Sequence, residues 1–233
     1  MDSEIREALG QCGCHLIEKL LPRVVVLPSD TEAIAKLVKL ASVKRLRLCP
    51  TGIGTSFPAN YDAPADAVFI LMSSINEIID LRVADAIVEV EAGMMAAELG
   101  KRLEGTDLQY PACLAEYPGT IGGALLSSDT AGLRHSELRR RLLAVKLVDA
   151  RGQSLKFGSL AIKNVAGYDY WSFLVGTGGR FGVITRVILN VENMPPILSV
   201  EKRFEECSTS EDPAQWIYAN LCKRLDPDGI FVR

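Results

Sequence analysis

Residues suited to bind an anion occur first in a glycine-rich loop at positions 50–56, with the sequence PTGIGTS. Glycines at positions 52 and 54 allow backbone amides to turn inward around a negative group, and the hydroxyls at 55 and 56 add donors. The loop is neither a Walker loop, because no Gly-Lys-Ser/Thr follows, nor a Rossmann fingerprint, because Gly-x-Gly-x-x-Gly is absent. Taken alone, it is compatible with a phosphate site or with an ordinary turn. Its candidate binding residues are Pro50, Thr51, Gly52, Ile53, Gly54, Thr55 and Ser56.

A second glycine-rich stretch has the sequence PGTIGG at residues 118–123 and is followed by two serines. Adjacent glycines let a flat ring or a diphosphate lie against the backbone, whereas the alternative explanation is tight packing of a helix. The candidate binding residues here are Pro118, Gly119, Thr120, Gly122, Gly123 and Ser127.

A third region combines KNVAGYD at residues 163–169 with GTGGRFGVIT at residues 176–185. The first string places polar and aromatic residues where a core strand would not have them. The glycines of the second could again serve packing alone. Gly182, Val183 and Ile184 are its candidate binding residues.

The elements that must position these loops begin with a helix expected over residues 1–21, which Gly13 could interrupt. A short β-branched strand at 24–28 is followed by a Ser-x-x-Glu capping box at 29–32, which predicts a helix to about Val43. The next strand, at 46–50, runs directly into the first glycine loop. This order predicts a β-α-β-loop unit with parallel strands.

Further elements alternate in the same way up to about Val191. Strands are expected at 68–72 and 86–93, and a second capping box at 74–77 suggests another helix start. A helix is expected at 95–103. Residues 144–157 read as a hairpin with Arg151 and Gly152 at its turn, and a long strand ends the region.

The composition of the 233-residue chain, 48% hydrophobic and 24% charged, is typical of folded domains with a large core. The net charge of −3 predicts no nucleic-acid partner. No run approaches 18 apolar residues and no secretory signal is evident, so we expect no membrane span and a cytoplasmic location. The six cysteines predict reduced, mostly buried thiols. Cys12 and Cys14 could hold a metal or an iron-sulfur cluster only with ligands from another chain.

Five segments occur in an informative order: CPTGIGTS, EVEAGMMAAELGKRL, YPGTIGGAL, IKNVAGYD and GTGGRFGVIT. Together they resemble the PCMH-type FAD-binding domain of the vanillyl alcohol oxidase superfamily, over about residues 22–192. KNVAGYD is similar in particular to the FAD-binding subunit of bacterial glycolate oxidase. The resemblance implies an α+β fold whose FAD-binding domain, residues 22–192, has two α/β subdomains at about 22–57 and 58–192. A helical segment at 1–21 precedes it, and a segment at 193–233 with one helix, from about Pro213 to Arg224, follows.

The resemblance also implies roles for the glycine-rich residues. Residues 50–56 would bind the FAD diphosphate through their amides, and residues 182–184 would offer backbone polar groups. The ribityl and flavin portion would lie along Gly119, Thr120, Gly122, Gly123 and Ser127. The sequence departs from the family pattern at four positions. Ile53 stands where relatives usually carry glycine, Ser136 and Arg140 replace a usual Gly and Asp, and Ala144 stands where Gly is common. These departures bear on geometry near the flavin more than on phosphate binding.

Residues 225–231, LDPDGIF, resemble the FDPxGIFNPG signature that closes family members after their substrate domain. Only about thirty residues separate Val191 from Leu225, far fewer than full-length relatives have. We therefore expect a complete chain from which the substrate-capping domain is largely deleted.

Oxidation of a 2-hydroxy acid requires a base for the hydroxyl proton and a cation for the carboxylate. The chain has two histidines. His15 lies outside the motifs and is expected to be a surface or packing residue. His135 could approach the flavin or link to it covalently, or it could be a solvated loop residue, which leaves the catalytic residues unknown.

These observations predict an FAD-binding subunit of a heteromeric glycolate or lactate dehydrogenase-type complex. It would relay electrons between a catalytic flavoprotein subunit and an iron-sulfur subunit. One alternative is a structural or assembly subunit with a vestigial flavin fold. Another is a self-sufficient small oxidase with an open flavin face.

Overall fold

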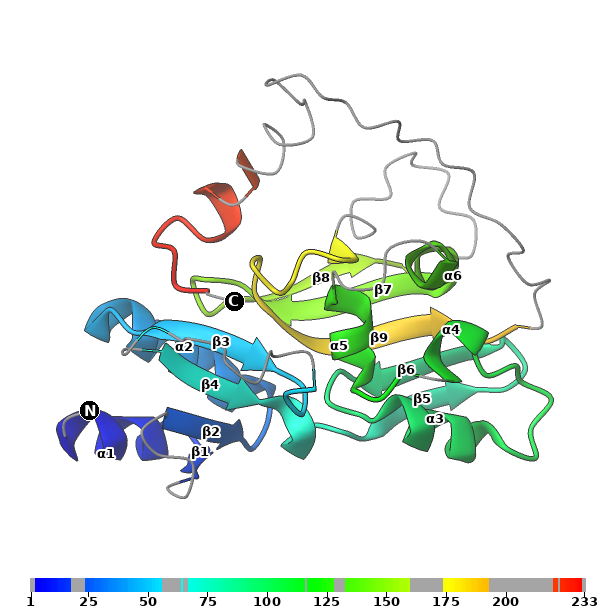
Figure 1. The fold of residues 1–233 in the computed structure, drawn as a ribbon, viewed down its shortest axis with the longest axis horizontal. Coiled ribbons are helices and arrows are strands. Elements are labelled where there is room, and N and C mark those ends of the chain that lie inside the picture. Colours follow the sequence, from blue (N-terminus) through cyan, green and yellow to red (C-terminus); the bar gives the residue numbers. More distant parts are fainter. Residues whose placement is uncertain are drawn as a thin grey trace.

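The computed structural model describes residues 3–17, 24–55, 64, 67–115, 117–127, 133–159, 174–192, 220–221 and 223–231, with the backbone alone at 3 and at 133–136. Its described strands form two sheets that lie side by side (Figure 1). The first contains four strands and the second five. The α+β fold class predicted from the sequence is confirmed.

The first sheet has the strand order β1-β2-β4-β3. Strands β2 and β3 both run parallel to β4, which lies between them, and β1 is antiparallel to β2. The parallel opening unit predicted from the sequence is therefore present, with β4 inserted between its two strands. The strands are β1 (Cys14–Leu16), β2 (Val24–Pro28), β3 (Arg47–Thr51) and β4 (Ala67–Leu71).

Two helices belong to this first sheet, α1 (Ser3–Gln11) and α2 (Thr31–Lys44). Asp30 caps the start of α2, because its Oδ1 accepts a hydrogen bond from the Ala33 amide at 2.8 Å. Ile34, Leu37 and Ala41 are among the buried residues of α2, at helical spacing that places them on one face. That face packs into the same core cluster as Leu48 and Val68 of the sheet.

The second sheet is antiparallel throughout, with the order β5-β6-β9-β7-β8. The predicted hairpin at 144–157 is confirmed as β7 and β8. The strands are β5 (Ile78–Arg82), β6 (Ile87–Glu91), β7 (Leu142–Val148), β8 (Ser154–Gly158) and β9 (Val183–Asn190).

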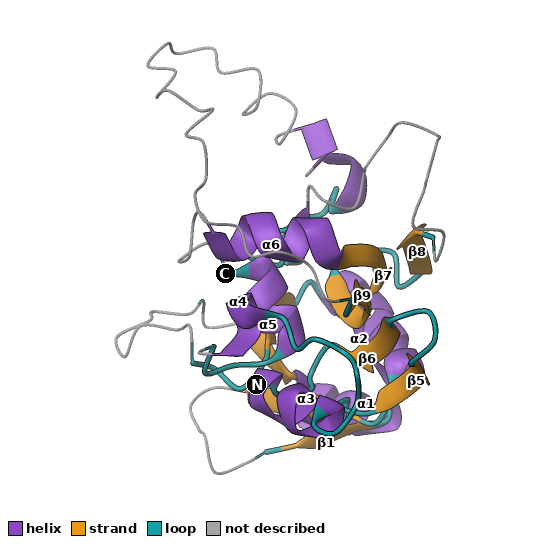
Figure 2. Cartoon of the chain, turned by 90° about the vertical axis from the view of Figure 1, so that its right-hand side faces the viewer, coloured by secondary structure: helices purple, strands orange, loops and turns teal. Residues whose placement is uncertain are grey.

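Four helices lie over one face of this second sheet, as the two views show together (Figures 1 and 2). Val88, Val145 and Val187 on that face share one core cluster with Leu99 of α3 and Leu125 of α5. The helices are α3 (Ala96–Leu103), α4 (Ala112–Ala115), α5 (Ile121–Leu126) and α6 (Leu133–Arg141).

The helix expected over residues 1–21 is wrong over residues 12–17, and residues 18–21 lie outside the described part of the chain. Helix α1 ends at Gln11, and Gly13 has φ +82°, a backbone conformation that turns the chain away from a helix. Cys14, His15 and Leu16 then pair with Leu27 and its neighbours in β2. This segment therefore forms the edge strand of the first sheet, and its apolar residues do not lie on one face of a helix.

The second capping box is also wrong, because residues 74–77 begin no helix. The Ser74 hydroxyl donates to the Pro28 carbonyl at 2.7 Å, and the Glu77 amide donates to Glu91 Oε2 at 3.0 Å. Both capping groups are thus engaged by distant parts of the chain. A single 3-10 turn, η2 (Met72–Ser74), leads into strand β5.

The expected subdomain boundary at residue 57 falls before β4, yet β4 pairs with both β2 and β3. The first sheet therefore extends to Leu71. Of the helix expected at 213–224, residues 220–221 and 223–224 are helical and the others lie outside the described residues.

Candidate functional site

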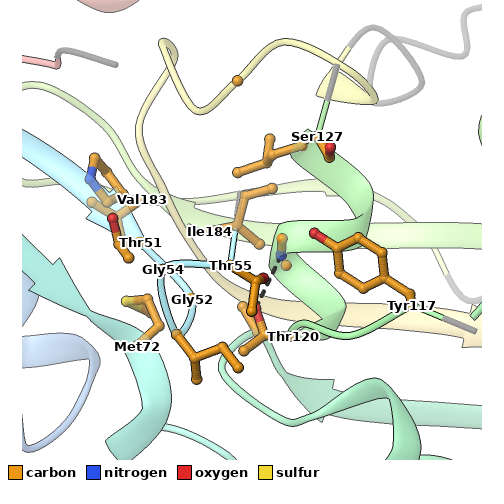
Figure 3. Close-up of a pocket in the computed structure, with 17 residues that line it drawn as sticks. Thr51, Gly52, Gly54, Thr55, Met72, Tyr117, Thr120, Ser127, Val183 and Ile184 are labelled. Carbon is orange, nitrogen blue, oxygen red and sulfur yellow. Dashed lines mark hydrogen bonds between the residues drawn. The ribbon is translucent and has the colours of Figure 1, made fainter. Parts of the chain in front are cut away.

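A pocket lies between the two sheets, where the first glycine loop meets helix α5 and the start of β9 (Figure 3). Its empty volume is about 740 Å³, which includes space open to solvent. Twelve of its lining residues are among the predicted site residues. They are Pro50, Thr51, Gly52, Ile53, Gly54, Thr55, Thr120, Gly122, Gly123, Ser127, Val183 and Ile184.

The first glycine loop leaves β3 at Thr51 and forms one wall of this pocket. Gly54 has φ +85°, which a residue with a side chain adopts only with strain. Among the described residues, the amides at positions 52–55 have no protein hydrogen-bond acceptor. Backbone amides need partners, so a loop with free donors in a pocket fits an anionic group such as a diphosphate.

Helix α5 forms the opposite wall and begins at its cap, Thr120. The Thr120 Oγ1 accepts a hydrogen bond from the Gly123 amide at 3.1 Å, drawn as a dashed line in Figure 3. The Gly122 amide donates to the Ala92 carbonyl at 2.8 Å. A Cβ at position 122 would lie 2.9 Å from the Ala92 Cβ, so this glycine serves close helix packing as well as lining the pocket.

Tyr117 is a pocket residue that the sequence reasoning missed. It is 7% exposed and lines the pocket, with its ring over the backbone of two glycines. A Cβ at Gly119 would lie 2.7 Å from Tyr117 Cε1, and a Cβ at Gly123 would lie 3.1 Å from its hydroxyl oxygen. No local feature of the sequence could have identified it, because its contact with these glycines depends on the fold.

The start of β9 contributes Val183 and Ile184 to the pocket wall. Gly182 is not among the lining residues. It has φ +139°, and a Cβ there would overlap the Val148 carbonyl oxygen in neighbouring β7. The glycine at 182 is therefore required by the pairing of β7 with β9.

Other predicted residues lie away from the pocket lining or outside the described residues. Pro118 is exposed, and Gly119 is buried against Tyr117 and Thr55. Position 56 and the string at 163–169 lie outside the described residues. His135 belongs to α6 and not to a loop, but its side chain is not described. The additional lining residues, besides Tyr117, are Met72, Ala92, Leu126 and Gly178.

The chemistry of the described lining is that of a binding site. Its polar groups are hydroxyls and backbone amides, and none of its residues is Asp, Glu, His, Lys or Arg. The described residues also contain no group of three or more His, Cys, Asp or Glu that could hold a metal ion. The pocket can hold a phosphate-bearing ligand, but its described wall supplies no carboxylate or imidazole base.

The cysteines at the N-terminus are buried free thiols, as expected. Burial raises the pKa of the Cys14 thiol to about 12, and the nearby Cys12 and Asp30 act in the same direction. Because metal ligation and nucleophilic attack need a thiolate, Cys14 is a poor candidate for either. Cys207 and Cys222 lie outside the described residues. No helix in the described part of the chain is both long and apolar enough to cross a membrane.

Comparison with known proteins agrees with this geometry. A family model described as "FAD binding domain" matches residues 22–158. The mitochondrial D-lactate dehydrogenase [cytochrome] of Arabidopsis thaliana is 34% identical over 178 residues, which are 75% of this chain and 31% of the relative. Glycolate oxidase subunit GlcD of Bacillus subtilis (strain 168) is 25% identical over 178 residues, 75% of this chain and 38% of the relative.

A solved structure of alkyldihydroxyacetonephosphate synthase shares the fold, with a TM-score of 0.59 at 23% identity. The match covers 74% of this chain and 32% of that one. The chain thus matches about a third of the length of these relatives. Because the family model spans more than half of the sequence, the chain belongs to the FAD binding domain family, and FAD is its cofactor.

Proposed function

We propose that this chain is the FAD-binding subunit of a heteromeric oxidoreductase acting on 2-hydroxy acids of the glycolate or lactate type. The observation that carries the proposal is the pocket in which both glycine-rich segments meet, where the amides at positions 52–55 have no acceptor among the residues that the structure describes. The names of the relatives, D-lactate dehydrogenase and glycolate oxidase subunit, support the class of substrate.

Different residues of this chain would bind different parts of the cofactor. The amides of positions 52–55 and the hydroxyls of Thr51 and Thr55 would hold the diphosphate. The wall formed by Tyr117, α5 and the start of β9 would face the remainder of the dinucleotide. The Thr120 cap would keep α5 in place through its bond to Gly123. Bound FAD supplies the chemistry of electron transfer, and the protein supplies its orientation.

The residues that line the pocket support separate roles for this chain and for a catalytic subunit. A 2-hydroxy acid gives up its hydroxyl proton to a base, and its carboxylate needs a cation. The described lining contains no acidic, basic or imidazole side chain. We therefore infer that a catalytic flavoprotein subunit oxidises the substrate, and that this chain's flavin relays electrons to an iron-sulfur subunit.

The test begins with the visible spectrum of the purified chain. We expect flavin bands, or their appearance after FAD is added. Glycolate and D-lactate with an artificial acceptor should give no turnover with the isolated chain, and turnover once partner chains co-purify. Colourless protein that rejects FAD would favour a structural subunit, and turnover by the isolated chain would favour a self-sufficient oxidase.

A further inference from the structure

Residues 226–231 lie against the outer edge of β3, although about 180 positions separate them in the sequence. The Leu48 amide donates a hydrogen bond to the Ile230 carbonyl at 2.6 Å, and Leu48 forms a parallel bridge with Phe231. In the order β1-β2-β4-β3, strand β3 would otherwise be an edge of the first sheet. We name residues 226–231 the docking segment.

The docking segment is anchored both by burial and by its own turn. Ile230 is 4% exposed and Phe231 6%, and both belong to the core cluster that contains Leu48. The Asp226 carboxylate accepts the amides of Ile230 at 2.8 Å and Phe231 at 2.9 Å. Gly229, with φ +62°, permits the turn that brings these amides back to Asp226. The segment therefore has a defined shape when it reaches β3.

The position of this contact links the segment to the cofactor loop. Leu48 lies within β3, which ends at Thr51, and the loop with the unpartnered amides begins at Gly52. Thr51 and the loop already line the pocket. A strand held on one side by β4 alone is freer to shift than a strand held on both sides, and the amides that follow it would shift with it.

We propose that the docking segment is a positioning element for the FAD diphosphate loop: by pairing with β3 at Leu48 it holds the amides of residues 52–55 in their binding arrangement. The proposal rests on FAD binding at this pocket. Because the two events are linked, bound FAD also stabilises the docked segment. Ile230 and Phe231 would act by pairing with β3, and Asp226 would act by stabilising the turn that presents them.

Two variants of the full chain test this. Phe231→Ala removes the buried ring, and Asp226→Asn weakens the turn with little change of shape. We expect each to raise the FAD dissociation constant, by about 10-fold for Phe231→Ala, and to speed hydrogen exchange at the amides of Leu48, Cys49 and Thr51 in β3. Exchange is measured without FAD, so it reports on β3 even if FAD fails to bind.

A matched control separates positioning from general stability. Leu9→Ala removes a fully buried side chain from the same core cluster, on helix α1. It should lower the melting temperature as Phe231→Ala does, while FAD affinity and exchange at Leu48, Cys49 and Thr51 stay within about twofold.

Two failures can be told apart. If Phe231→Ala loses stability like Leu9→Ala but keeps wild-type exchange at β3 or wild-type FAD affinity, the docking segment does not position the loop and the proposal is overturned. If wild-type protein binds no FAD, the proposed function fails instead. Faster exchange of β3 in Phe231→Ala would then still support the role of the docking segment in holding β3.

Discussion

The Gly52 backbone and the Thr120 side chain touch across the boundary between the two sheets. A Cβ built at position 52 would overlap the Thr120 hydroxyl oxygen and lie 3.1 Å from its Cγ2. Gly52 belongs to the loop after β3, and Thr120 caps α5. The two pocket walls can therefore approach this closely only because residue 52 has no Cβ.

Gly52→Ala should weaken FAD binding by at least about 10-fold, because the loop must move away from α5 to accommodate the methyl group. Titration with FAD, followed by flavin absorbance, measures this. Gly10→Ala is the matched control, since a Cβ at position 10 would meet nothing within 4 Å. Wild-type affinity in Gly52→Ala would contradict the close approach of the two walls.

A double variant of Gly52 and Thr120 should show that the effects of the two substitutions on FAD affinity are coupled. Thr120→Ala removes the overlapping hydroxyl but also the cap on Gly123, so alone it should weaken FAD binding. In the double variant, Gly52→Ala should cost less affinity than it does in the wild-type background. Strict additivity of the two effects would argue against their contact.

Gly54 differs from Gly52 because its constraint is conformational. The nearest atom to a Cβ at position 54 is Thr51 Cγ2, at 3.9 Å, so there is space for a side chain. The φ of +85° disfavours one, by about 1–2 kcal/mol for most residues and less for Asn. FAD retention should therefore fall in the order Gly, Asn, Val at position 54, measured as flavin content after gel filtration. Equal retention in Gly54→Asn and Gly54→Val would contradict this explanation.

The sequence predicted the loops better than their surroundings. A glycine's freedom at position 54 and the Pro-Gly-Thr turn are local properties that made these residues candidates, and the family resemblance assigned residues 50–55 and 120–123 to one site. The capping box at Ser74 failed because Pro28 and Glu91, which are remote in sequence, engage its groups. The packing of Gly182 against Val148 could not be foreseen, because the two residues become adjacent only in the folded sheet.

The contacts of Tyr117 and of the docking segment also could not be predicted from the sequence. Nothing local distinguishes a tyrosine that covers two glycines from one in a surface turn, because the contact depends on how α5 begins. The resemblance singled out the LDPDGIF string but not its place beside Leu48, since a pairing across the whole chain has no periodic signal.

Arg141 is a buried cation whose replacement should destabilise the protein. Its side chain is 1% exposed, and Nε lies 3.0 Å from Glu137 Oε1. Its terminal nitrogens donate to the carbonyls of Asn190 and Glu192 and to Gln109 Oε1. Arg141→Met would leave a nearly buried Glu137 and these acceptors without their partner. We expect a loss of about 3–5 kcal/mol in the free energy of unfolding, measured with urea.

The control for Arg141 uses a pair with the same spacing at the surface. Arg102 Nε lies 2.9 Å from Glu98 Oε1, also four residues away, but its side chain is 58% exposed. Arg102→Met should change the free energy of unfolding by at most about 0.5 kcal/mol. Similar losses in the two variants would show that burial does not determine the strength of the Arg141 interaction.

The charged cluster of Glu89, Lys146 and Arg186 predicts how stability depends on pH. Glu89 Oε1 lies 2.7 Å from Lys146 Nζ and 3.3 Å from Arg186 Nη1, which joins β6 to β7 and β9. Partial burial acts to raise the pKa of Glu89, but the hydrogen bonds and charges of the two cations outweigh it and lower the pKa below its ordinary value of 4.5.

A carboxylate with a lowered pKa in the folded state stabilises the protein above its unfolded pKa, and this contribution is lost as the pH falls through the folded value. Wild-type protein should therefore melt at a higher temperature than Glu89→Gln at pH 7, and the difference should shrink steadily below about pH 4.5. Melting curves from pH 7 to about pH 3 test this. Glu98→Gln, at the exposed pair, should show little difference from wild type across the range. A gap for Glu89→Gln that persists at the acidic end would mean that the side chain contributes through packing and not through its charge.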